Sequence, residues 1–204
     1  AIISVLNGNW ISAPRMMDVF LAKSNMYIEA GYTMFGVMVS SQPQYTIPDE
    51  IIDLKRAVRF VRYNSKEYAI DASNDPVDKV SARVQAVAVF YPPTDFINYG
   101  GVNTTGTINQ QGLVMARVAA AFDFKEWSDA TGTFVSITDT KKRLEIAQGI
   151  SPINFVTSDD PPVIIIHGDK DFLVPKQQSE SIIEKFNEAK VPNKFIIKEG
   201  GSHG

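Results

Sequence analysis

The sequence predicts an α/β fold: a doubly wound, mostly parallel sheet in a three-layer α/β/α sandwich. Five short apolar runs, rich in β-branched residues, have the length and composition of buried strands. Helical patterns separate most of these runs, and such alternation is typical of parallel sheets, because each parallel connection needs a crossover segment. The predicted strands span residues 2–6, 33–39, 84–90, 162–166 and 194–198.

Two strand–helix units make up the first half of the chain. The first strand ends in the turn Asn-Gly-Asn-Trp at residues 7–10, and Pro14 then begins a helical pattern that Gly31 ends. The second strand leads, through a loop, to a helix that begins at Pro48 and carries an apolar stripe directed toward the core. This stripe consists of Ile51, Leu54, Val58 and Val61.

The alternation breaks in the middle of the chain. A polar join at residues 71–76 has no strand pattern and precedes the third strand. Residues 92–160 then form a long excursion that contains two helical patterns, at 110–122 and 139–148. So long an excursion between strands is usually an active-site cover or a binding segment.

The last unit consists of the fourth strand, a helix from Pro175 to about Ala189, and the fifth strand. Ile182, Ile183 and Phe186 form the inward face of this helix. With right-handed crossovers preserved, the predicted order in the sheet is second, first, third, fourth, fifth.

Length and composition indicate a single domain over residues 1–204, with a cap or pocket excursion at about 92–160. An apolar content of 44% over 204 residues is enough for one well-filled core. The net charge of −3 argues against a nucleic-acid or anionic-membrane surface. The sequence contains no apolar stretch near the ~20 residues of a membrane span, and no signal peptide. A cytoplasmic location is therefore favoured, although the missing initiator Met leaves export open.

Cysteine and histidine counts restrict the available chemistry. The chain has no Cys, so disulfides, thiolate nucleophiles and thiolate metal sites are excluded. His167 and His203 are its two His residues, so a His-rich metal site is impossible. No cofactor and no metal are expected, and any imidazole chemistry must use one of these two residues.

An acid and an imidazole follow the last two strands. Asp171 lies in the run HGDKDFLVP at residues 167–175, and His203 lies in GGSHG at residues 200–204. Parallel strands deliver both loops to one edge of the sheet, where an acid can orient a His that takes the proton of a nucleophilic Ser. We expect a carboxylate oxygen of Asp171 within hydrogen-bonding distance of a His203 nitrogen.

The third member of such a triad is not evident. The one literal G-x-S-x-G is residues 200–204, where Ser202 directly precedes the candidate base. A nucleophile elbow places its Ser on a tight turn between a strand and a helix, and no helix follows in this sequence. We interpret this match as a decoy.

On these residues the chain resembles the α/β-hydrolase superfamily, in particular its small carboxylesterase and lipase-like branch related to acetyl-xylan and feruloyl esterases. Further matching pieces are VAVFYPPTDF at residues 87–96 and Ser-Pro before Asp-Asp-Pro-Pro at 151–162. The resemblance implies that Asp171 is the triad acid and His203 the base. It also implies that backbone N–H groups of the turn at Gly8, Asn9 and Trp10 contribute to the oxyanion hole.

The resemblance fails at one internal position. The family places a strand, the Ser elbow and a helix between its second helix and the strand here counted third, whereas this chain has only the polar join. A nucleophile segment would fall between Tyr68 and Val84. The 204 residues are therefore either a reduced version of the fold or an incomplete record of a longer chain.

Several other residues have a structural alternative. His167 is expected to be structural and Asp169 a turn residue, and Trp10 serves equally well as a core plug. Ser40, Ser41 and Ser73 are surrogate nucleophiles by residue type but are better explained as loop hydroxyls. Tyr91, Asp95, Phe96 and Tyr99 line a substrate pocket or pack under the excursion.

Three functions follow, in decreasing order of support. The first is a serine carboxylesterase acting on a small-molecule ester, with a Ser-His-Asp triad whose Ser is not present in this sequence. The second is a non-catalytic relative that has lost the nucleophile. The third treats Asp169 and Asp171 as a Mg²⁺-binding D-x-D of a phosphotransferase, although His167 and Gly168 separate them from the strand end. Acyl and alcohol specificity and oligomeric state remain open.

Overall fold

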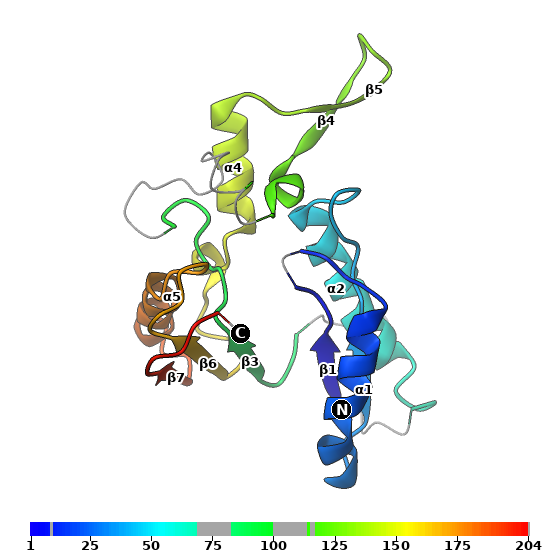
Figure 1. Cartoon of the computed structure of the whole chain (residues 1–204), viewed down its shortest axis with the longest axis vertical. Coiled ribbons are helices and arrows are strands. Elements are labelled where there is room, and N and C mark those ends of the chain that lie inside the picture. The colour runs from blue at the N-terminus through cyan, green and yellow to red at the C-terminus, as the bar shows by residue number, and fades with distance from the viewer. Residues whose placement is uncertain (9, 69–82, 100–113, 115–116, 204) are drawn as a thin grey trace. The chain divides into compact units, whose positions relative to one another are not determined.

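The computed structural model describes residues 1–8, 10–68, 83–99, 114 and 117–203 (Figure 1). The chain divides into two compact units. Unit 1 comprises residues 1–83 and 120–123, and unit 2 comprises residues 84–119 and 124–204. Doubly wound folds are built from two halves, and one domain over residues 1–204 stays a prediction.

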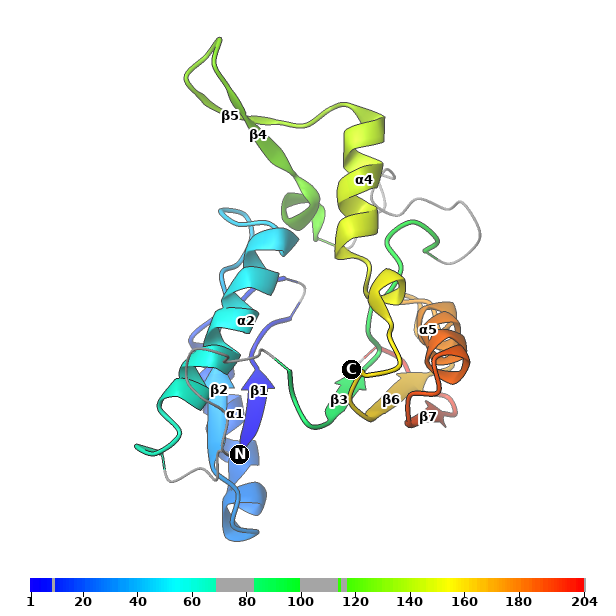
Figure 2. The same ribbon diagram turned by 180° about the vertical axis from the view of Figure 1, so that it is seen from behind.

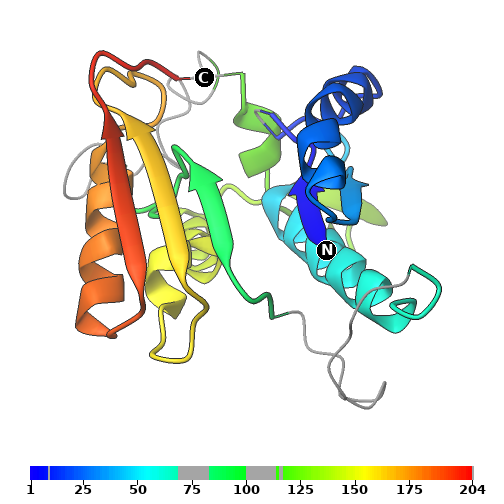
Figure 3. The same ribbon diagram turned by 90° about the horizontal axis from the view of Figure 1, so that it is seen from below.

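Unit 1 contains the first two strand–helix units. Strand β1 (Ile2–Val5) pairs in parallel with β2 (Met34–Val37), as predicted. Helix α1 (Arg15–Glu29) and helix α2 (Ile47–Tyr63) lie on opposite sides of β1 (Figure 3). The predicted stop after α1 is Gly31, at φ 85°, a conformation that glycine adopts without strain.

Helix α2 shows why its sequence becomes a helix at this point. Thr46 precedes its first turn, and the Asp49 carboxylate accepts a 2.9 Å hydrogen bond from the Thr46 N–H, which completes a capping box. Val58 and Val61 of the predicted stripe are buried. The same face also buries Ile47 and the carboxylic acid Glu50, which the apolar stripe did not include.

Unit 2 contains a three-stranded parallel sheet in the order β3 (Val87–Phe90), β6 (Val163–Gly168), β7 (Asn193–Lys198). Figure 3 shows the three strands side by side, with helix α5 (Gln177–Glu188) against one face. The core of this unit consists of Val163, Ile165, Ile182, Phe186 and Val191. The α/β prediction is confirmed, and the last three strands have the predicted order.

The strands form two hydrogen-bonded parallel sheets in the described residues, β1–β2 and β3–β6–β7, instead of the single five-stranded sheet predicted. The segment for which the family has one more strand, residues 69–82, lies outside the described residues. No helix in the described part of the chain combines the length and apolar character that crossing a membrane requires.

The excursion contains a feature that the sequence analysis missed. Strands β4 (Lys125–Ser128) and β5 (Thr133–Ser136) form an antiparallel hairpin that projects away from helix α4 (Thr140–Ile150) (Figure 2). The 3₁₀ turns η2 (Ala119–Phe122) and η3 (Pro152–Phe155) flank this region. Helix α4 confirms the second predicted helical pattern but continues through Gly149. Most of the pattern at 110–122 lies outside the described residues.

Candidate active site

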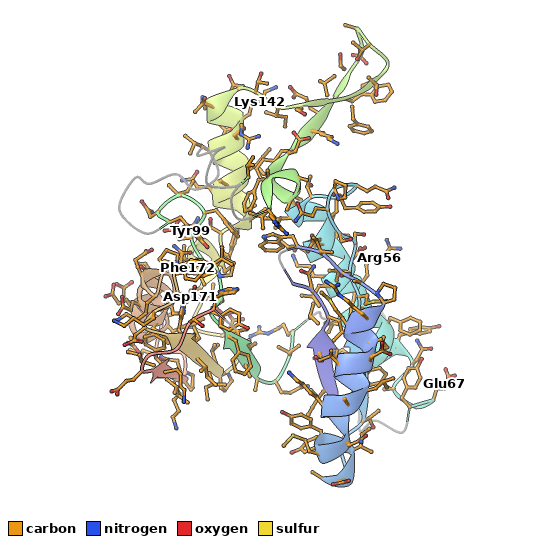
Figure 4. All side chains as sticks on the ribbon, viewed as in Figure 1. Arg56, Glu67, Tyr99, Lys142, Asp171 and Phe172 are labelled. Carbon is orange, nitrogen blue, oxygen red and sulfur yellow. The ribbon has the colours of Figure 1, made fainter. Side chains whose placement is uncertain are left out.

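Asp171 lies in the loop that follows β6, and its side chain is fully buried (Figure 4). Its Oδ1 atom accepts hydrogen bonds from the N–H groups of Leu173 and Val174, at 2.9 and 2.8 Å. This turn forms because a carboxylate readily accepts from backbone N–H groups two and three residues further on. The turn fixes the carboxylate and leaves Oδ2 available for another partner.

That partner is His203. Its Nδ1 atom lies 2.8 Å from Asp171 Oδ2, which is the contact expected from the sequence. A carboxylate can only accept, so Nδ1 carries the proton, and in a neutral imidazole the lone pair is then on Nε2. The His203 side chain is 24% exposed whereas that of Asp171 is buried. The pair has the geometry of a general base oriented by an acid.

Glycines bring the two loops together. A Cβ on Gly168 would lie 2.2 Å from the Gly201 carbonyl oxygen, so only glycine allows this approach. The Lys170 N–H donates to the same carbonyl at 2.9 Å, and the Gly200 N–H donates to Asp169 Oδ1 at 2.7 Å. Asp169 is therefore a turn residue, as expected, and in addition it fastens the His203 loop to the Asp171 loop.

His167 has the structural role predicted for it. Its ring is fully buried, and Nε2 lies 2.8 Å from the Val174 carbonyl oxygen. A carbonyl accepts only, so Nε2 carries the proton and Nδ1 accepts from the Ser179 hydroxyl, at 2.6 Å. The ring thus joins α5 to the turn around Asp171.

Two further polar side chains lie near the buried Asp171 carboxylate, His167, whose Nε2 is 3.5 Å from Asp171 Oδ2, and Tyr99. The Tyr99 hydroxyl donates to the Leu173 carbonyl oxygen at 3.0 Å. Burial raises the pKa of the Tyr99 phenol well above its usual range, and the negative charge of Asp171 raises it further. Figure 4 shows Tyr99 and Asp171 in the same part of unit 2, next to Phe172. Because the Asp171 side chain is buried, its charge interacts more strongly with an imidazolium than the charge of an exposed carboxylate would.

The other three substrate-pocket candidates, besides Tyr99, differ in their environments. The Tyr91 ring lies against His203, with 4.2 Å between ring centroids. Asp95 is buried, and its Oδ1 accepts from the N–H groups of Ile97 and Asn98, so this carboxylate stabilises a turn. Phe96 is only 4% exposed. The packing alternative therefore describes Asp95 and Phe96.

Two buried polar residues escaped the sequence analysis. Gln178 Oε1 accepts from the N–H groups of Thr94 and Asp95, at 2.8 and 2.7 Å, and so holds the start of the excursion against α5. Ser151 accepts from the Phe96 N–H at 2.9 Å. Gln178 lies four residues before Ile182 on the inward face of α5, and that position was the one available signal.

The turn after β1 belongs to unit 1. The Gly8 N–H donates to the Ile11 carbonyl oxygen at 3.0 Å. In this conformation it therefore has an acceptor and does not donate to an oxyanion. Trp10 has φ 60°, and its ring packs edge-on against Phe122, in agreement with the core-plug alternative. Asn9 lies outside the described residues.

Glu50 lies beneath this turn. Its Oε2 accepts from Asn7 Nδ2 at 2.8 Å, whereas Oε1 is buried and has no hydrogen-bond partner among the residues that the structure describes. Burial raises the Glu50 pKa to about 7, the Asn7 hydrogen bond opposes this shift, and the charges of Asp49 and Asp53 add to it. Periodicity alone does not predict a buried acid at this position of α2, since the predicted apolar stripe did not include Glu50.

The surrogate serines receive no support as nucleophiles. Ser40 Oγ donates to Asp53 Oδ2, as does the Ser40 N–H at 3.0 Å, so this residue caps a loop. Ser202 is exposed, and Ser73 lies outside the described residues. Asp171 directs both of its oxygens to N–H donors, which fits an acid that orients His203 better than a Mg²⁺ ligand of a D-x-D pair.

Comparison with known protein families shows which family this chain matches. The model of the BD-FAE family matches residues 1–77 and 73–186. The chain belongs to the BD-FAE family. The two matched segments overlap at residues 73–77, which lie between Tyr68 and Val84, where the sequence predicts that a nucleophile segment would fall.

Individual relatives agree with this assignment. Esterase LipQ of Mycobacterium tuberculosis is 25% identical over 214 aligned residues, which cover 92% of this chain and 46% of LipQ. The BD-FAE chain spans about half the length of the curated relatives it matches.

Solved structures show the same fold. A truncated carbohydrate esterase from gut microbiota has a TM-score of 0.74 and 23% identity, over 100% of this chain and 78% of its own. Esterase Est2 of Thermogutta terrifontis has a TM-score of 0.65 and 18% identity, over 99% of this chain and 71% of its own. The fold is therefore α/β-hydrolase-like.

Proposed function

We propose that this BD-FAE chain carries the acid and the base of a serine carboxylesterase that hydrolyses small esters. The 2.8 Å contact between Asp171 Oδ2 and His203 Nδ1 carries the proposal. In the proposed reaction, His203 Nε2 takes the proton of a Ser hydroxyl as the hydroxyl attacks the ester carbonyl. Asp171 stabilises the imidazolium, which then protonates the departing alcohol. A water molecule activated by the same His releases the acyl group.

The proposed nucleophile is a Ser outside the 204 residues, on a segment that falls between Tyr68 and Val84. Two observations support this position: the family model matches in two segments that meet at residues 73–77, and β3 has one hydrogen-bonded neighbour, β6, among the described strands. A strand that ends in an elbow would pair with the open side of β3.

For the oxyanion, we propose backbone N–H groups of the turn at residues 8–10. This assignment rests on the turn's place after β1 and on its resemblance to the family turn. Gly8 can contribute only if its hydrogen bond to Ile11 opens. Asn9 and Trp10 are the other two candidates.

Fluorophosphonate labelling followed by peptide mass spectrometry tests where the nucleophile lies. We expect the 204-residue chain to remain unlabelled. The protein as its source cells make it should have an intact mass several kDa above 22.5 kDa and should be labelled on a Ser that the printed sequence lacks. Label on Ser202 would refute the decoy interpretation. A native mass near 22.5 kDa with no label would favour the non-catalytic relative.

A further inference from the structure

Tyr91, directly after β3, has an unusual backbone. Its φ is 38°, in the left-handed region that favours glycine, yet its N–H still donates to the Ile166 carbonyl oxygen of β6 at 2.8 Å. A bulky residue held at positive φ is strained, and such strain persists only where the surrounding structure imposes it. Strain of this kind is concentrated at functional sites. The conformation therefore requires an explanation beyond the end of a strand.

The contacts of the Tyr91 ring explain this backbone conformation. Its centroid lies 4.2 Å from that of the His203 imidazole, with 50° between the ring planes. It also lies edge-on to the fully buried His167, at 6.5 Å and 75°. His167 is itself fixed by two hydrogen bonds. The tyrosine ring thus contacts both the buried, hydrogen-bonded His167 ring and the partly exposed His203 ring.

His203 needs this support because the hydrogen bonds that fasten its loop to the Asp171 loop are made by Gly200 and Gly201. The residue lies in no helix or strand, and Gly200 and Gly201 precede it. The hydrogen bond to Asp171 fixes the distance and direction of Nδ1 in the plane of the imidazole. It does not prevent the ring from rotating about the axis of that hydrogen bond. A ring packed against the imidazole removes this remaining freedom.

We propose that Tyr91 is a positioning residue for His203: its ring packs against the imidazole and holds Nδ1 on Asp171, so that Nε2 keeps one direction. The left-handed backbone conformation of Tyr91 directs its ring toward His203. The catalytic consequence rests on the proposed esterase function, whereas the geometric consequence does not. The interaction also gives Tyr91 a role different from lining a substrate pocket.

NMR spectroscopy of the 204-residue chain, labelled with ¹⁵N in its histidines, tests the proposal. The chain has two His residues, so each ring gives its own signals. The His203 Nδ1–H signal reports the contact with Asp171, and the His167 Nε2–H signal reports an intact fold. The test variants are Tyr91→Leu, which removes the ring, and Tyr91→Phe, which removes only the hydroxyl. Phe90→Leu is the matched control, because Phe90 is 58% exposed and precedes Tyr91 directly.

We expect Tyr91→Leu to abolish the protected His203 Nδ1–H signal and to leave the His167 signal in place. Tyr91→Phe and Phe90→Leu should retain both signals. A His203 signal that persists in Tyr91→Leu would overturn the proposal, as would its equal loss in Tyr91→Phe. If Tyr91→Leu also loses the His167 signal, Tyr91→Gly decides, because glycine accepts the positive φ and still removes the ring. Loss of the His203 signal alone in this variant supports the proposal, and its retention contradicts it.

Kinetics of the protein as its source cells make it give a second readout. Tyr91→Leu should lower kcat about ten- to a hundredfold and leave KM within about twofold, because a misdirected base impairs the chemical step rather than binding. Tyr91→Phe should restore kcat. An increase in KM alone would assign Tyr91 to the substrate pocket instead. Asp171→Asn separates the two proposals: if it leaves activity unchanged, the esterase triad fails whatever Tyr91 does.

Discussion

The buried polar groups of the two units differ in how completely they are hydrogen-bonded. Around the acid of unit 2, Asp171, His167, Gln178 and Ser151 all have partners. In unit 1, Glu50 Oε1 and Ser12 Oγ are buried and have no hydrogen-bond partner within the described part of the chain. A fully paired buried network is rigid and specifies one geometry, whereas an unpaired group destabilises its surroundings. The acid–base pair thus has a preorganised support that the turn of unit 1 lacks.

The close approach of Gly168 to Gly201 is the contact whose disruption should destabilise the chain most. In Gly168→Ala, the new Cβ would lie 2.2 Å from the Gly201 carbonyl oxygen, and the His203 loop must move away. We expect a loss of about 3 kcal/mol in the free energy of unfolding, measured with urea, together with loss of the Asp171–His203 contact.

Gly149→Ala is the matched control for this substitution. Apart from its chain neighbours and the backbone of its own helix, α4, no atom of the described residues lies within 4 Å of the position of its Cβ. The free energy of unfolding should rise by up to about 1 kcal/mol. Equal destabilisation by the two substitutions would show that the approach of Gly168 to Gly201 is unimportant.

The paired network is tested next by Gln178→Leu. This change removes the acceptor of the Thr94 and Asp95 N–H groups and leaves both buried, so we expect a loss of about 2 to 3 kcal/mol. Gln177→Leu makes the same chemical change at a half-buried neighbour and should cost less than about 1 kcal/mol. A smaller effect at Gln178 than at Gln177 would contradict the view that this network is rigid.

Substitution of Glu50 in unit 1 should have the smallest effect of the three test substitutions. It should also raise the free energy of unfolding, whereas Gly168→Ala and Gln178→Leu should lower it. The Glu50 pKa is raised in the folded chain from 4.5 to about 7, so the folded state binds more protons between these values. The contribution of Glu50 to the free energy of unfolding is therefore fully present below pH 4.5, and it declines as the pH rises toward 7. Glu50→Gln should stabilise the chain by about 1 to 2 kcal/mol at pH 8 and by almost nothing at pH 4.

Glu67→Gln serves as the control, since Glu67 is exposed (Figure 4). Glu67→Gln should change the free energy of unfolding by the same small amount at pH 4 and at pH 8. If urea unfolding of Glu50→Gln follows the same pH dependence as the parent, Glu50 is not the group that destabilises unit 1 above neutrality.

The sequence predicted those features that depend on local periodicity. Apolar runs located all five parallel strands, and the loops after β6 and β7 located Asp171 and His203, because strand ends in a parallel sheet are determined by topology. The hairpin β4–β5 escaped because most of its residues are exposed, so neither strand contains a buried apolar run. Length is not the reason, since β1, β2 and β3 also have four residues each. Trp127 and Phe134, which pack together across the turn that contains Gly132, were the available signal.

The rest depends on tertiary contacts that no periodicity encodes. Glu50 lies on the buried face of α2 although the predicted apolar stripe did not include it, and only its burial indicates a raised pKa. The left-handed φ of Tyr91 is likewise invisible in a Phe-Tyr-Pro sequence, because tyrosine normally avoids that conformation.

The central claim is that Asp171 and His203 are the acid and base of an ester hydrolase. Hydrolysis of p-nitrophenyl acetate by the protein as its source cells make it tests this most directly, with His203→Ala, Asp171→Asn and Ser202→Ala compared with the parent. We expect His203→Ala to lower kcat/KM at least about a thousandfold and Asp171→Asn to do nearly the same, whereas Ser202→Ala keeps most of the activity. Full activity in His203→Ala, or a loss of activity confined to Ser202→Ala, would contradict the account.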